Sequence, residues 1–181
     1  MLDELGARGE LDWTSVIVDA TSVRVKGGAD RAEPGGPRQI RQQVACPVEA
    51  QGIPVVVRVS GANTHDSLAL KPLVKRIPAV RSRRGPHRRR PGKLRADKAY
   101  HSAGTLSWLR QRGIIPRIAR PGIESSERLG RHRWKIERSI SWLLGYRRLT
   151  ARHEHKGSHF LAFLGLAAAL TCYRKLAKLT T

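Results

Sequence analysis

Alternating and β-branched apolar residues mark four strand-like segments of the chain. They are residues 14–25, 53–60, 94–99 and 114–119. Asp19 lies in the middle of the first segment and shares a face with Ile17 and Val23 by the two-residue period of a strand. Pro116 weakens the last segment, because proline has no N–H to donate to a ladder.

Helical spacing of apolar residues predicts four helices between and after these strands. They cover residues 66–77, 101–113, 131–144 and 160–173. In the third helix, Glu137 falls at the edge of an apolar stripe that includes Ile136 and Ile140. The fourth segment carries no charge and is shorter than the roughly 20 residues that span a bilayer, so we expect a buried core helix there.

The order of these elements predicts a single α/β domain, for which 181 residues suffice. Residues 1–12 are expected to form a lead-in and residues 13–179 the domain. Within it, residues 26–51 show neither a clear strand period nor a clear helix period, so we expect an irregular segment. Residues 81–93 are expected to form a basic loop between proline and glycine breakers.

Charge narrows the class of partner. Lys and Arg total 35 against 14 Asp and Glu, which gives a formal net charge of +21 and favours nucleic acid as the partner. No polybasic amphipathic helix or lipidation motif is present, so we expect no membrane partner. The acidic first twelve residues argue against a secretory signal, and Cys46 and Cys172 are far apart, so we expect a cytoplasmic location.

The basic loop is the first candidate for contacts with nucleic acid. It contains six arginines and one lysine, and each phosphate that such side chains neutralise adds to affinity and to its salt dependence. The candidate DNA-binding residues here are Arg83, Arg84, Arg88, Arg89 and Arg90. The grip would be independent of base sequence.

Three carboxylates on hydrophobic elements are the candidates for chemistry. Asp19 lies inside a strand, Asp97 ends another, and Glu137 lies on the third helix. Carboxylate oxygens suit Mg²⁺ or Mn²⁺, and two such ions can support phosphoryl transfer. Two simpler interpretations remain open: an ion pair of Glu137 with Arg133 or Arg138, and Asp19 as an ordinary edge-strand residue.

At these residues the chain resembles bacterial insertion-sequence transposases of the DDE class, specifically the IS-five-like group. The matching runs are VIVDATSVRVKGG around Asp19, GIPVVVRVSGANTHDS from Gly52, LRADKAYHS around Asp97, GIIPRIARPGIESSERLGRHRW, and WKIERSISWLLGYRRL around Glu137. Each run alone is weakly specific. Five of them in family order, from about Leu11 to Leu176, make the resemblance strong.

The resemblance implies an RNase H-like fold, a mixed central sheet flanked by helices. It also implies that Asp19, Asp97 and Glu137 are the catalytic, metal-binding triad, holding two Mg²⁺ or Mn²⁺ ions. Arg133 would position phosphate or order the glutamate, with Arg138 and Lys98 as further DNA contacts. The reaction would be hydrolytic nicking at transposon ends, followed by attack of the 3′-hydroxyl on target DNA.

Two departures from the family pattern bear on activity. Relatives carry an N-terminal helical DNA-binding region that a chain of this size cannot hold beside the core, so we expect a separately encoded region or a truncated copy. We also expect the protein to act on double-stranded DNA as a homo-oligomer. Residues 38–48 lack the family's Gly-x-Lys-x-His run. We interpret this as a local shift of reading frame that would leave the strand beside Asp19 malformed.

Two other functions are weighed against the transposase. A non-catalytic basic nucleic-acid-binding protein would explain the charge, but not three carboxylates on hydrophobic elements. A stand-alone RNase H-like nuclease would share the site and lack strand transfer.

Overall fold

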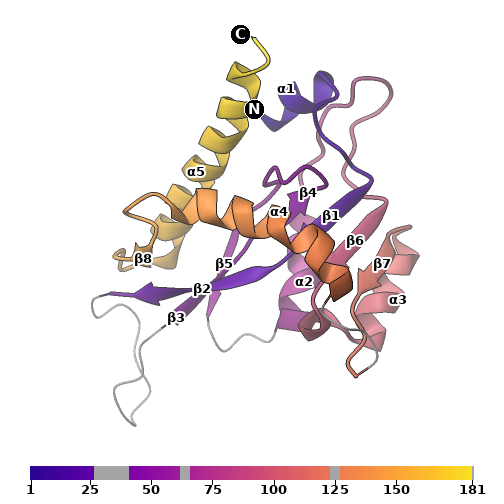
Figure 1. The fold of residues 1–181 in the computed structure, drawn as a ribbon, viewed down its shortest axis with the longest axis horizontal. Coiled ribbons are helices and arrows are strands. Elements are labelled where there is room, and N and C mark those ends of the chain that lie inside the picture. Colours follow the sequence, from indigo (N-terminus) through magenta and orange to yellow (C-terminus); the bar gives the residue numbers. More distant parts are fainter. Residues whose placement is uncertain (27–40, 62–65, 123–126, 181) are drawn as a thin grey trace.

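The computed structural model describes residues 1–26, 41–61, 66–122 and 127–180, with the side chains of 66–68 and 127–133 outside the description (Figure 1). The strands are β1 (Ser15–Val18), β2 (Ala20–Val25), β3 (Arg41–Ala45), β4 (Val48–Glu49), β5 (Arg58–Gly61), β6 (Lys93–Ala96), β7 (Ile115–Ile118) and β8 (Ala151–Arg152). The helices are α1 (Leu2–Ala7), α2 (Asp66–Arg76), α3 (Ala103–Gln111), α4 (Glu127–Leu144) and α5 (Gly157–Ala177), with a 3₁₀ turn at Lys98–Tyr100.

The strands form two four-stranded sheets, which β1 and β2 connect, since these strands follow one another with only Asp19 between them. β1 pairs with β4 antiparallel and with β6 parallel, and β7 extends the parallel part, so the order is β4-β1-β6-β7. β2 continues into a second group of strands, in the order β5-β3-β2-β8. Both sheets combine parallel and antiparallel pairs and are flanked by helices, which confirms the expected mixed α/β fold, although the strands form two four-stranded sheets where one central sheet was expected.

Helices cover both faces of the central strand, which explains why every residue of β1 is buried. Val16 and Val18 belong to a core cluster with Leu70 and Leu73 of α2. Ile17 points the other way, into a cluster that Ile136 of α4 and residues of α5 complete. The alternation along β1 therefore assigns α2 to one face and α4 with α5 to the other (Figure 1).

The expectation of an irregular segment over 26–51 is wrong for residues 41–49. Arg41–Ala45 pairs antiparallel with Ala20–Arg24, and Val48 pairs with Ile17. The strand beside Asp19 is well formed, contrary to the malformed strand that the departure at 38–48 implied. Val44 and Ala45 are buried, and the ladder supplied by β2 overrides the weak local pattern. Residues 38–40 lie outside the described part of the chain.

Two further boundaries differ from expectation. The predicted strand 53–60 begins only at Arg58, because Pro54 cannot donate and residues 53–57 make isolated contacts with the Pro47–Glu49 segment. The helix predicted over 131–144 begins earlier than expected, at Glu127. The lead-in at residues 1–12 forms α1, whose Leu5 is fully buried in the core.

The C-terminal helix is longer and less buried than predicted. α5 has 21 residues, and only one face is buried, through Phe160, Leu164, Ala167 and Cys172. Leu166 and Tyr173 are more than half exposed. α5 is long and apolar enough to cross a membrane, but core helices of soluble proteins meet the same criteria of length and composition. Within its most apolar 18 residues, 28% are buried inside the protein.

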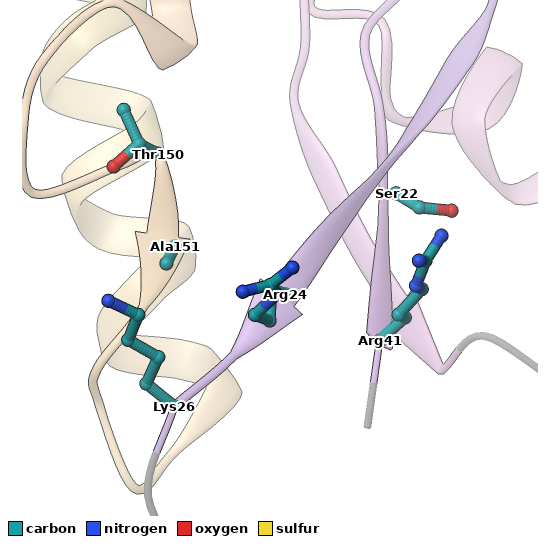
Figure 2. A pocket seen from close by; sticks show the side chains of 6 residues that line it. All are labelled: Ser22, Arg24, Lys26, Arg41, Thr150 and Ala151. Carbon is teal, nitrogen blue, oxygen red and sulfur yellow. The ribbon is translucent and has the colours of Figure 1, made fainter. Parts of the chain in front are cut away.

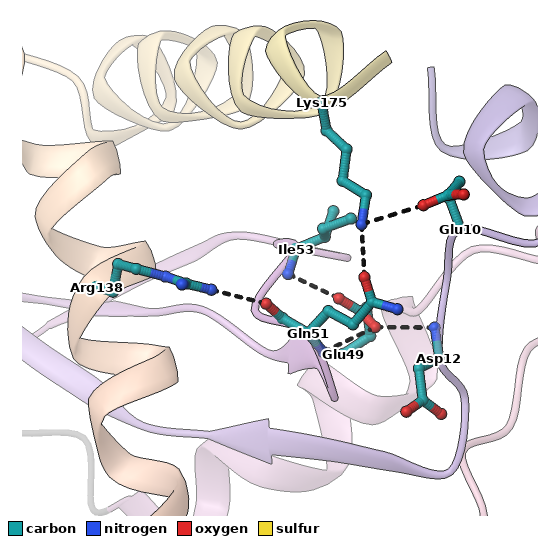
Figure 3. Close-up of polar contacts among 7 residues, drawn as sticks. All are labelled: Glu10, Asp12, Glu49, Gln51, Ile53, Arg138 and Lys175. Atoms are coloured by element: carbon teal, nitrogen blue, oxygen red, sulfur yellow. Dashed lines mark hydrogen bonds and ion pairs between the residues drawn. The ribbon is translucent and has the colours of Figure 1, made fainter. Parts of the chain in front are cut away.

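A buried carboxylate joins elements from distant parts of the chain (Figure 3). Glu49, in β4, has no exposed surface, and its two oxygens accept hydrogen bonds from three backbone N–H groups. The donors are Asp12 at 2.9 Å, Gln51 at 3.0 Å and Ile53 at 2.9 Å. Glu49 thereby fixes the turn after β4 against the segment that leads into β1.

The same turn anchors α4, the helix that carries Glu137. Lys135 Nζ donates to Ala50 O at 2.6 Å, and Ser139 Oγ donates to Gly52 O at 2.5 Å. Arg138 Nη2 donates to Gln51 O at 2.8 Å. These three donors lie along one edge of α4, so the helix is fixed in rotation and position relative to β4.

Substitution of Glu49 tests this junction. Glu49→Gln offers one acceptor oxygen where three N–H groups need two, so we expect a loss of about 1–3 kcal/mol in the free energy of unfolding. Urea denaturation measures it. The control is Glu10→Gln, which breaks only the partly exposed 3.4 Å ion pair with Lys175 and should cost less than about 1 kcal/mol. Equal losses of unfolding free energy in the two variants would show that the hydrogen bonds of Glu49 do not stabilise this junction more than a surface ion pair does.

The pH dependence of that difference has a defined sign. Burial raises the pKa of Glu49 above its ordinary value of 4.5, outweighing the three backbone hydrogen bonds that lower it. The folded state therefore binds the proton more readily than the unfolded state, and stability due to Glu49 rises as pH falls through the raised pKa. We expect the difference between wild type and Glu49→Gln to widen on acidification toward pH 4.5; a narrowing would contradict the raised pKa.

Candidate functional site at the carboxyl ends of β1 and β6

Two of the three candidate carboxylates follow neighbouring parallel strands. Val18, the last residue of β1, pairs with Ala96, the last residue of β6. Asp19 and Asp97 are the next residues of their chains, so the pairing register places them side by side at one edge of the sheet. The carboxyl ends of parallel strands are where such folds position functional side chains.

Asp19 owes its position to the interruption between β1 and β2. Its Oδ1 accepts a hydrogen bond from the N–H of Ala20 at 2.8 Å, and its carbonyl oxygen accepts from Cys46 N at 3.3 Å. The residue is half-buried. The carboxylate is thus oriented by its own backbone at the point where the strand bends.

Asp97 is oriented in a similar way. It caps the 3₁₀ turn Lys98–Tyr100, and its Oδ1 accepts from Lys98 N at 2.5 Å. Tyr100 is buried in the core and holds this turn against the sheet. Lys98, a predicted DNA contact, is exposed beside the carboxylate. A cation next to the two aspartates could meet a phosphate that approaches them.

Glu137 is exposed on α4, one position after the buried Ile136. At about 100° per residue it lies on the edge of the helix away from Lys135, Arg138 and Ser139. Those three residues donate hydrogen bonds to the turn after β4. This turn lies beside the beginning of β1, because Glu49 of β4 pairs with Val16 of β1. Glu137 therefore lies on the other edge of α4.

Asp19 and Asp97 follow paired strand ends, but the structure does not bring Glu137 to them to complete a three-carboxylate cluster. Within the described residues, no three Asp, Glu, His or Cys side chains lie close enough together to hold a metal ion. The alternative ion pair of Glu137 with Arg133 cannot be described, because the Arg133 side chain lies outside the described part of the chain.

Arg138, predicted to contact DNA, makes several contacts within the protein. Its guanidinium lies 4.8 Å from the ring centroid of Trp134 and 4.7 Å from that of Trp142, besides its bond to Gln51 O. Trp134 and Trp142 are about half exposed, at 50% and 45%. These contacts hold Arg138 on the surface of α4, and its contact with DNA remains a prediction.

All five candidate arginines of the basic loop are exposed, and one of them, Arg89, also anchors the loop to the end of α2. Arg89 Nε donates to Ile77 O at 2.8 Å and Nη2 to Lys75 O at 3.2 Å, so this side chain satisfies carbonyls at the end of α2. Arg83, Arg84 and Arg88 are exposed and line a pocket of about 390 Å³ with Trp13. Arg90 is also exposed, 3.4 Å from Arg112 O through Nη1.

Glu49 is the polar residue that sequence reasoning missed. It accepts hydrogen bonds from three donors, and its role is structural, since all three are backbone N–H groups. Its neighbours Val48 and Ala50 show no periodic pattern, so nothing in the sequence distinguishes Glu49 within the segment 26–51 that was expected to be irregular.

Comparison with known proteins identifies related chains. Residues 14–172 match the family described as transposase DDE domain. A protein of Burkholderia cepacia described as a transposase for insertion sequence element IS402 is 38% identical over 147 residues, which is 81% of this chain and 67% of that protein.

Solved structures with some likeness include the catalytic core domain of BIV integrase, at a TM-score of 0.44 and 15% identity, covering 86% of this chain and 80% of that one. Another is a chain of the simian T-cell lymphotropic virus intasome in complex with PP2A regulatory subunit B56 gamma. Its TM-score is 0.43 at 12% identity, with 85% of this chain and 48% of that one covered.

The anchoring contacts of Arg89 predict different outcomes for the arginines of the basic loop. Replacing Arg83, Arg84 and Arg88 by Gln should weaken binding to any DNA duplex and lower the slope of log K against log salt by about 0.9 for each phosphate that is no longer neutralised. Fluorescence anisotropy at several salt concentrations measures this. Arg89→Gln should instead lower the melting temperature, because it leaves carbonyls of α2 unsatisfied. Weakening confined to one DNA sequence would contradict a backbone grip.

Proposed function

The chain belongs to the family of DDE transposase domains, and from this we propose that Asp19, Asp97 and Glu137 form its catalytic triad. The reaction we propose is metal-dependent hydrolytic nicking at transposon ends, then attack of the 3′-hydroxyl on target DNA. One observation supports the proposal: Val18 pairs with Ala96, so Asp19 and Asp97 each follow the end of one of two neighbouring parallel strands.

The donor set fits divalent cations with hard-ligand preference. Carboxylate oxygens are the ligands that Mg²⁺ and Mn²⁺ prefer, and we propose two such ions. When bound, these ions would polarise the attacked phosphate and stabilise charge on the attacking and leaving oxygens. Asp19, Asp97 and Glu137 would hold them, Glu137 joining from the edge of α4 opposite the anchored one.

The protein's own contribution would be position and charge. Backbone N–H groups orient both aspartates, and the bonds from Lys135 and Ser139 to the turn after β4 fix the rotation of α4. Lys98 beside Asp97 would contact phosphate, and Arg133 would do so from the turn of α4 before Glu137. Groups held in place in this way lower the cost of reorganisation when charge develops in the reaction. Glu137 would still have to move toward the two aspartates, because the three carboxylates do not lie close enough together in the structure to hold a metal ion.

Double-stranded DNA is the proposed partner, as transposon end and as target. A formal net charge of +21 and the exposed arginines of the basic loop support it. Within the family we propose the IS-five-like group, acting as a homo-oligomer on DNA. A non-catalytic nucleic-acid-binding role is not favoured, because it leaves the paired aspartates unexplained.

The triad predicts three variants without activity. Asp19→Asn, Asp97→Asn and Glu137→Gln should each lower Mg²⁺-dependent nicking of duplex DNA by more than about 100-fold, since even indirect metal partners typically contribute 10- to 100-fold. Asn retains an acceptor oxygen for the N–H groups of Ala20 and Lys98, so both aspartate variants should fold normally by circular dichroism.

The matched control is Glu10→Gln, a surface substitution that should nick as fast as wild type. Near-wild-type nicking by any one triad variant would remove that residue from the site. Nicking without joining of transposon ends to target DNA would favour a stand-alone nuclease.

A further inference from the structure

A second basic site lies at the far end of β2, beyond the aspartates. A pocket of about 430 Å³ is lined by Ser22, Arg24, Lys26, Arg41, Thr150 and Ala151. In Figure 2 Arg24 lies between Lys26 and Arg41, and the Arg41 side chain extends toward Ser22. Three cations therefore meet at one pocket, whose described lining contains no carboxylate.

The strand register sets two of these cations directly opposite each other, which is unfavourable unless an anion binds between them. Arg24 pairs directly with Arg41 in the antiparallel ladder of β2 and β3. Like charges directly opposite on neighbouring strands repel and destabilise the pair. The two-residue period of β2 adds Lys26 to the same face as Arg24. An anion between these side chains would convert the repulsion into attraction.

The pocket opens on a different face from the helix that carries Glu137. Val23 packs in the cluster formed with Ile136 and Leu143 of α4. Arg24 alternates with Val23 along β2, so its side chain lies on the opposite face of the strand. A ligand in the pocket would therefore be held apart from α4, and its removal should leave the chemistry at the carboxylates unchanged.

Guanidinium groups match phosphate because they present several N–H donors in a planar fork, and a nearby ammonium adds charge. We propose that this pocket binds a phosphodiester group of a DNA strand, as a contact separate from both the aspartates and the basic loop. The proposal rests on DNA as the partner put forward above, but not on catalysis. Arg24 is five residues beyond Asp19, about 17 Å along an extended strand.

Neutralising the paired arginines tests the site. Arg24→Gln/Arg41→Gln should weaken binding of a 30-bp duplex several-fold at all sequences and lower the salt slope by about 0.9, the value for one phosphate contact. The matched control, Arg110→Gln/Arg117→Gln, removes the same charge from exposed residues of α3 and β7 and should leave the slope unchanged. Equal slopes for wild type and the pocket variant would overturn the proposal.

Two measurements separate loss of the site from loss of the fold. The pocket variant should melt at or above the wild-type temperature, because the repulsion between Arg24 and Arg41 is relieved. Arg24→Lys/Arg41→Lys should restore most of the salt slope. If the Lys variant keeps the low salt slope of the Gln variant while both melt normally, the loss does not come from charge at the pocket, and the phosphate contact is overturned.

Two further measurements show whether the phosphate belongs to DNA or to a small ligand, and whether the proposed catalytic triad is correct. Pyrophosphate titration that saturates wild type and not the pocket variant, with DNA binding equal in both, would assign the pocket to a small phosphate ligand and overturn the DNA assignment. At saturating duplex, the pocket variant should nick at the wild-type rate. Absence of nicking in both proteins would reject the proposed triad, while the difference in salt slope would still support the pocket.

Discussion

The parallel pairing of β1 with β6 is the constraint on which the candidate site depends. These strands are separated by more than seventy residues, yet their registers end together at Val18 and Ala96. Parallel neighbours require a crossover through a helix, and α2 supplies part of that connection. If the register slipped by one residue, the two aspartates would point to opposite faces of the sheet. The burial of all four residues of β1 holds the register in place.

The sequence predicted those elements whose own residues carry a clear pattern, and it missed features that depend on contacts between distant segments. The β-branched run around Asp19 and the apolar stripe around Ile136 each identify their own element, and both elements form. β3 was missed because Gln42 and Gln43 have low intrinsic strand preference, and only the ladder of β2 makes that segment extended. Glu49 was missed because its role depends on three N–H groups that the fold brings together.

The C-terminal helix shows the opposite limitation. An uncharged run from Phe160 to Tyr173 predicts helix correctly, but the run does not say how many sides of it are covered. Only the face with Phe160 and Leu164 finds neighbours, and Leu170 remains 45% exposed. Composition thus predicts that an element is apolar, while exposure depends on what the rest of the chain can place against it. The same reasoning explains why the three carboxylates could be nominated from sequence, whereas the placement of Asp19 and Asp97 after neighbouring strand ends follows only from the strand order.

β7 lies at one edge of its sheet, with β6 on one side, so its other side presents open backbone among the described residues. Ile115 N donates to Gly92 O, and alternation along the strand turns the nitrogen of Pro116 outward. A foreign strand that approached this border would find no donor at the central position and a positive charge at Arg117 beside it. Pro116, which weakened the strand pattern in the sequence, thereby discourages edge-to-edge pairing between the sheets of two molecules. The same residue thus protects the protein from self-association at this edge.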